Sequence, residues 1–200
     1  MNKRLCRMIL IGLAGMIFGA GGTWAYFTHS RIADNTFCVG GNEIEIQEDY
    51  EPPKILTVGD NIFRKKVQVK NTGTVSCFVR VFADFSDYAI KKHSWISPDG
   101  SDYYPAEEYA LYLPDEWSYI DLEKDALLGG FYYYTVPLEA GKNTVSLFEK
   151  IRCSFQSAEE IREFDILVSA ESVQVFDNNG AEFTGDNAWR EAWTEYLERR

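Results

Sequence analysis

Short runs of alternating polar and apolar residues, separated by turn-forming residues, constrain the fold of this chain more than any other feature. Glu43 to Gln47 (EIEIQ) has the period of two that is typical of a strand with one buried face. The other runs that predict strands are Ile62 to Lys70, which ends in the same alternation, Cys77 to Ala83, Gly130 to Val136, Thr144 to Phe148, Ile151 to Phe155 and Phe164 to Phe176. Because strands and helices do not alternate, the sequence predicts an all-β sandwich with Greek-key or jelly-roll connections.

Turn residues between the runs indicate how neighbouring strands connect. Asn71 to Thr74 (NTGT) separates the second run from the third, so we expect these two runs to form adjacent antiparallel strands joined by a short loop. Ser157 to Glu160 has the S-x-x-E form of a capping box and predicts a short helical turn before the last strand.

The middle of the chain has no stable period. Ser86 to Glu123 mixes Tyr, Trp, Asp and Pro, and we expect an irregular loop or insertion there. Trp95 and Trp117 lie in this segment and are a candidate ligand patch, because binding surfaces often use aromatic side chains on loops.

The C-terminus predicts one amphipathic helix, from Asn187 to Arg200. Its aromatic and aliphatic residues recur at helical spacing, namely Trp189, Trp193, Tyr196 and Leu197. Such a face most often packs on its own domain, and docking of a partner protein is the alternative.

The N-terminus has the three parts of an export signal. Lys3, Arg4 and Arg7 precede an apolar run from Met8 to Phe18. Small residues follow, with Thr23 at −3 and Ala25 at −1 of a candidate cleavage site before Tyr26. The sequence thus predicts a signal peptide over 1–25 and a secreted β-sandwich domain over 26–200.

Two other interpretations of this segment stay open. The stretch from Met8 to Phe27 is about 20 residues long, enough for a retained membrane anchor, although its five glycines disfavour a helix. A buried helix of a soluble protein is the other, although the three leading basic residues are not typical of one.

The charge of the chain is strongly acidic. Without Lys3, Arg4 and Arg7, its 20 basic residues become 17 against 31 acidic ones, which gives a net charge of −14. A nucleic-acid partner is therefore not expected, because phosphate binding depends on Lys and Arg. An anionic membrane surface is disfavoured for the same reason, so we expect membrane contact only through an uncleaved signal.

The residues that commonly carry catalysis are few. His29 and His93 are the two histidines, and no HExxH, GxSxG or P-loop motif occurs, so neither an enzyme nor a bound cofactor or metal is expected. Cys38, Cys77 and Cys153 lie in apolar runs, where either a Cys77–Cys153 disulfide or three separate core thiols fit. Asp99-Gly100 and Asp177 to Gly180 predict turns, with a calcium ligand role as the alternative.

Several motifs together resemble the TasA/camelysin family of exported Gram-positive proteins. They are GGTWAYFT at the signal junction, NTFCVGG before the EIEI strand, VGDNIFRKKVQVKNTGTVSCFVRV, GFYYYTVPLEAGKNTVSLFEKI, FDILVSAESVQV and the AWREAW end. The resemblance covers most of the chain outside Ser86 to Glu123. One departure lies at a turn, where Pro52-Pro53 and Val58-Gly59-Asp60 replace the usual Pro-Gly.

The resemblance implies a jelly-roll-like antiparallel β-sandwich that is processed by a SipW-like signal peptidase. It also implies a fibre subunit of the biofilm matrix or cell surface, with copies of itself and other matrix proteins as partners. In that family the N-terminal segment can complete the sheet of the next subunit, and here Phe27, Ile32, Phe37 and Val39 would be its apolar anchors. Pairing of the same segment within its own domain is the alternative.

Two other functions stay open at this point. The family name implies a camelysin-like metallopeptidase, although no residue pattern here supports one. A cell-surface adhesin or binding module that uses Trp95 and Trp117 is the other.

Overall fold

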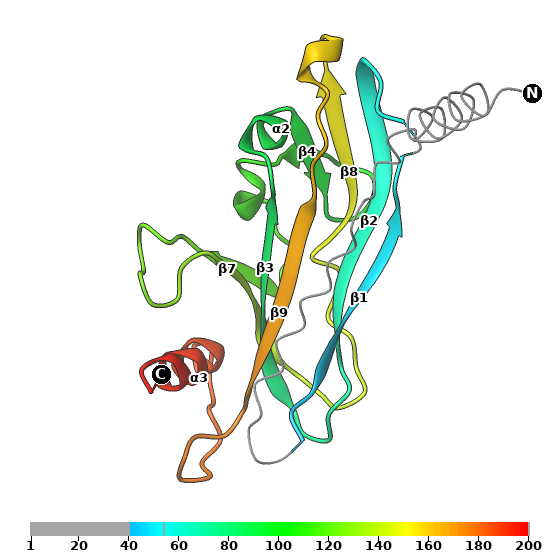
Figure 1. The fold of residues 1–200 in the computed structure, drawn as a ribbon. Helices are drawn as coiled ribbons and strands as arrows, with labels where there is room; N and C mark the ends of the chain where they lie inside the picture. The colour runs from blue at the N-terminus through cyan, green and yellow to red at the C-terminus, as the bar shows by residue number, and fades with distance from the viewer. Residues whose placement is uncertain (1–40, 54, 200) are drawn as a thin grey trace, which may run out of the picture.

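Two antiparallel sheets make up most of the structure. The computed structural model describes residues 41–53 and 55–199. One sheet has the strand order β1-β2-β8-β4-β5 and the other has the order β6-β7-β3-β9 (Figure 1). The strands are β1 (Ile44–Glu51), β2 (Gly59–Asn71), β3 (Cys77–Phe85), β4 (Ser94–Ser97), β5 (Tyr104–Pro105), β6 (Trp117–Ile120), β7 (Phe131–Leu138), β8 (Phe148–Phe155) and β9 (Ile166–Gln174).

The main core lies between the sheets. Every second residue of β2 from Phe63 to Val69 is buried, and Val79 and Val81 of β3 are fully buried in the same cluster. Burial of each such aliphatic side chain contributes about 1.5–3 kcal/mol. The alternation in β2 therefore predicts this strand and its buried face correctly.

A second core lies on the outer face of the four-stranded sheet. The helix α3 (Ala188–Leu197) lies there (Figure 1). Its Trp189 and Trp193 form one buried cluster with Phe78 of β3 and Tyr133 of β7. The predicted C-terminal helix is thus confirmed, and its aromatic face packs on its own sheet. Because β3 is covered on both faces, its first five residues are all buried.

The predicted pairing of the second and third runs is wrong. β2 pairs with β1 and β8, whereas β3 pairs with β7 and β9 in the other sheet. The buried Asn71 side chain fixes this crossing. Its Nδ2 donates to the carbonyls of Val75 and Leu138, both at 2.8 Å, and its Oδ1 accepts from the Gly73 amide at 2.9 Å.

The segment predicted as an irregular loop contains several short elements joined by irregular chain. It contains α2 (Tyr88–Lys92), β4, β5, a 3-10 turn (Tyr109–Leu111) and β6. The Asp87 side chain caps α2, accepting from the Ala89 amide at 2.7 Å. Strands of two to four residues are too short to show a period in the sequence, which explains why these elements were not predicted.

Near β8, the structure corrects one predicted strand and confirms one predicted helical turn. Of the run Thr144 to Phe148, only the last residue belongs to a strand, and Leu147 instead donates its amide to the Val67 carbonyl at 2.8 Å. The capping-box segment forms a 3-10 turn (Ala158–Glu160), in which Glu160 accepts from the Gln156 amide at 2.7 Å.

Candidate functional site

The long edge strands of the two sheets lie on the same side of the molecule. β1 has 8 residues and β9 has 9, whereas β5 and β6 at the opposite edges have 2 and 4. β1 and β9 approach each other across the sandwich (Figure 1). The Ser172 hydroxyl donates to Asn42 Oδ1 at 3.1 Å. Within 41–53 and 55–199, no strand pairs with the outer side of either one.

The register of β9 defines which of its amides face this outer edge. The Ser86 amide donates to the Asp165 carbonyl at 2.9 Å, next to the pair Phe85↔Ile166. In an antiparallel ladder, residues whose backbone groups bond to the neighbouring strand alternate with residues whose backbone groups do not. Because Asp165 bonds to the chain of β3, the amides of odd-numbered residues of β9 face β3. The amides of even-numbered residues, including Ser172, therefore point away from β3, in the direction from which another strand would add.

An ion pair lies on the inner face of β1 and β2, close to this edge. Lys65 Nζ is 2.8 Å from Glu48 Oε1 and 4.7 Å from the centre of the Tyr50 ring, and both charged side chains are almost fully buried. Burial, with smaller contributions from nearby acids such as Asp165, raises the pKa of Tyr50 to about 12. A strand added at this edge would thus meet both apolar and charged side chains.

The structure separates the two tryptophans of the predicted ligand patch. Trp117 lies in β6, is 5% exposed, and donates its indole N–H to the Val145 carbonyl at 3.2 Å. Trp95 lies in β4, in the other sheet, and is half-buried beside Arg152. The pair is therefore not one surface patch, because β6 carries Trp117 into the core.

The other predicted site residues lie outside the described part of the chain. These are the cleavage-site residues Thr23, Ala25 and Tyr26 and the candidate assembly residues Phe27, Ile32, Phe37 and Val39.

A buried charged pair under α3 was not anticipated from the sequence. Arg80 of β3 is 4% exposed, and its Nε donates to Glu171 Oε2 of β9 at 2.8 Å. Its guanidinium lies between the rings of Phe131 and Trp193, 4.0 and 4.4 Å from their centres. The alternation in β3 correctly places Arg80 on the outer face, but only the docked helix makes that face buried.

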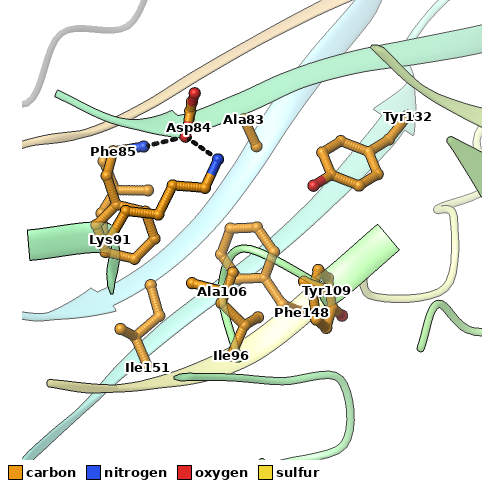
Figure 2. Close-up of a pocket in the computed structure, with 11 residues that line it drawn as sticks. Ala83, Asp84, Phe85, Lys91, Ile96, Ala106, Tyr109, Tyr132, Phe148 and Ile151 are labelled. Carbon is orange, nitrogen blue, oxygen red and sulfur yellow. Dashed lines mark hydrogen bonds and ion pairs between the residues drawn. The ribbon is translucent and has the colours of Figure 1, made fainter. Parts of the chain in front are cut away.

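A small cavity lies in the core beside the ion pair of Asp84 and Lys91 (Figure 2). Asp84 Oδ1 accepts from Lys91 Nζ at 2.7 Å and from the Phe85 amide at 2.8 Å. The remaining wall is mostly apolar, with Tyr109 and Tyr132 among its residues. Its volume of about 10 Å³ is near the lower limit for one water molecule, so it cannot hold an organic ligand.

The two acidic turns are formed as predicted. Asp99 accepts from the Ser101 amide at 2.8 Å, and Asp177 accepts from the Ala181 amide at 2.8 Å. These backbone hydrogen bonds lower the pKa of both carboxyls. Each carboxylate thus stabilises its own turn.

Cys77 and Cys153 are free, buried thiols. For these two residues the structure favours separate core thiols over a disulfide, whereas Cys38 lies outside the described residues. Burial raises the pKa of Cys77 to about 12, and that of Cys153 to about 11 despite the hydrogen bond with Ser94.

We expect both thiols to resist DTNB in the folded protein at pH 8 and to react within seconds in denaturant. The thiolate is the reactive form, and burial disfavours it only in the folded state. The resulting stabilisation is complete below the unfolded thiol pKa of about 8.5 and is lost as the pH rises towards 11–12. Fast labelling of Cys77 or Cys153 themselves in the folded protein at pH 8 would contradict this burial.

One comparison with known proteins gives a match. The family model described as "Camelysin metallo-endopeptidase" matches residues 1–103, just over half of the chain. The chain belongs to the camelysin family. The resemblance noted from the signal junction and the first strands is thus confirmed. No curated protein and no solved structure matches the chain.

The name of the camelysin family implies a catalytic metal, but the described residues do not fit one. They contain no group of three or more His, Cys, Asp or Glu side chains that could hold a metal ion, whereas a catalytic zinc takes three protein ligands. His93 ends α2, where its amide donates to the Ile90 carbonyl at 3.0 Å. His29 lies outside the described residues. Burial keeps the thiols of Cys77 and Cys153 protonated, and a thiol must lose its proton to bind a metal.

No helix within the described part of this camelysin-family chain is long and apolar enough to cross a membrane.

Proposed function

We propose that this chain is a secreted structural protein whose copies assemble into fibres through the segment that begins at Tyr26. In this proposal residues 1–25 are a signal peptide that a SipW-like peptidase removes. Residues 26–200 then form a jelly-roll-like domain in the extracellular matrix or on the cell surface of a Gram-positive bacterium, with other matrix proteins as further partners.

The observation that carries the proposal is the pair of long sheet edges, β1 and β9, on one side of the molecule. An edge strand presents a row of backbone donors and acceptors that an extended segment can pair with. The opposite edges, β5 and β6, are much shorter. Phe27, Ile32, Phe37 and Val39 would supply the apolar side chains that such a segment needs to bury.

The first test removes the segment. We expect protein that begins at Tyr26 to form fibres visible by electron microscopy, and protein that lacks residues 26–38 to stay monomeric. Fibres of equal length and number from the truncated protein would reject assembly through this segment. Monomers from both forms would instead favour pairing of the segment within its own domain.

The second test blocks the acceptor edge. Ser172→Pro removes an outward-facing amide of β9, so we expect it to abolish fibre growth, while Ser172→Ala keeps the amide and should assemble like the parent protein. Proline is tolerated on a strand edge whose N–H is not used in the sheet, so thermal unfolding of the two variants should be similar. Equal fibre growth of both variants would exclude the edge of β9 as the acceptor.

Peptidase activity is the second candidate, and the description of the matching family favours it. A camelysin-like peptidase should cleave casein, lose this activity with a chelator, and bind zinc at one ion per chain. Casein cleavage that survives every chelator, or protein that binds no zinc in titration, would reject this function.

A further inference from the structure

The outer face of the five-stranded sheet carries a row of neighbouring side chains across four strands. The register pairs Ile62 of β2 with Arg152 of β8, Arg152 with Trp95 of β4, and Trp95 with Pro105 of β5. Ile62 is 56% exposed and Pro105 is also exposed. The row thus offers a partly apolar surface with one cation at its centre.

Arg152 is held between two aromatic rings on this face. Its guanidinium carbon is 4.7 Å from the centre of the Trp95 ring and 5.1 Å from that of Tyr103, which lies just before β5. Such contacts are favourable for a cation and fix the plane of the guanidinium. The two rings therefore preorganise a group that binds carboxylates through two parallel hydrogen bonds.

The charge of Arg152 is not balanced by an acid of its own. Within 41–53 and 55–199 its side chain forms no ion pair or hydrogen bond, and its Nε is buried without a partner. The neighbouring cations are all satisfied, since Arg64 pairs with Asp49 at 2.8 Å and Lys66 with Glu149 at 3.1 Å. Lys150 donates to the Gly100 carbonyl at 3.0 Å. The guanidinium of Arg152 is therefore available to pair with a carboxylate from outside the chain.

We propose that this face binds an acidic polysaccharide, with Arg152 as the receptor for the carboxylate of a uronic acid. A sugar ring has a flat C–H face that can lie on Trp95 and Ile62, while its carboxylate pairs with the guanidinium. The face of a sheet has no free backbone groups for an extended peptide, which pairs at edges instead. This inference does not depend on fibre assembly, because the row lies away from the outer edges of β1 and β9.

The test uses the full-length chain and polygalacturonate, with fully methyl-esterified polygalacturonate as the ligand that has the same rings without the charge. We expect titration calorimetry to show binding of the acid polymer and at least about tenfold weaker binding of the ester. Arg152→Gln should weaken binding of the acid polymer by a similar factor. Arg199→Gln, the same change of charge just after the end of α3, away from this sheet, should leave it unchanged.

A second variant tests whether weaker binding results from loss of folding. Arg152→Lys keeps the charge but lacks the planar fork, so its binding should fall several-fold while its thermal unfolding matches that of the parent. Equal binding of the acid and ester forms, no binding of either, or unchanged binding by folded Arg152→Gln would overturn the proposal. So would an effect of Arg152→Gln on self-association alone, because that outcome identifies a carboxylate of a second copy as the partner.

Discussion

We expect Trp193→Ala to lower the free energy of unfolding by about 3–5 kcal/mol, measured by urea denaturation followed by circular dichroism. The indole ring is fully buried in the core under α3, where its centre is 6.0 Å from that of Tyr133 and 5.8 Å from that of Tyr196. Its removal leaves a cavity and also takes away one of the two rings that cover Arg80. Both effects raise the free energy of the folded state, so both lower the free energy of unfolding.

Two variants on α3 test this explanation. Trp193→Phe keeps a ring in the same place and should cost clearly less than the alanine change. Glu191→Gln alters an exposed residue of α3 and should cost less than about 1 kcal/mol. A loss below about 1 kcal/mol for Trp193→Ala would show that the fold does not need the docked helix.

The features that the sequence predicted well are local ones. The helical spacing of Trp189 and Trp193 indicated α3, and the period of two in β2 indicated which of its side chains are buried. In each case the information lies within a few neighbouring residues, because one face of one element packs against the rest of the protein.

The features that the sequence did not predict depend on contacts between distant segments. Nothing next to Asn71 indicates that its amide will bind the Leu138 carbonyl and direct the chain into the other sheet. The burial of Trp117 likewise depends on a strand of only four residues that pairs with β7. Such non-local contacts leave no pattern in a short window of sequence.

The candidate binding surface around Arg152 also depends on contacts between distant segments. Trp95 was noticed for its residue type, but its contact with Arg152 arises from the pairing of β4 with β8 across a long stretch of chain. The assembly edge has a similar origin, since the side-by-side placement of β1 and β9 follows from the order of strands in both sheets. The sequence could therefore supply the candidate residues but not their partners.

The second large effect concerns the buried charge under α3, where we expect Glu171→Ala to cost about 3–5 kcal/mol in the same denaturation experiment. The Arg80 side chain is 5% exposed and that of Glu171 is 21% exposed, so the change leaves a cation in a largely apolar site. The rings of Phe131 and Trp193 stabilise the guanidinium only in part. Most of the expected loss is therefore the energy of an unpaired buried charge.

An exposed pair on the other sheet provides the matched control. Arg64 and Asp49 are 2.8 Å apart with side chains 47% and 51% exposed, so Asp49→Ala should cost no more than about 1 kcal/mol. The double change Arg80→Met with Glu171→Leu removes both buried charges and should recover most of the stability that Glu171→Ala loses. Equal losses for Asp49→Ala and Glu171→Ala, or no recovery in the double variant, would show that burial under α3 does not determine the energy of this pair.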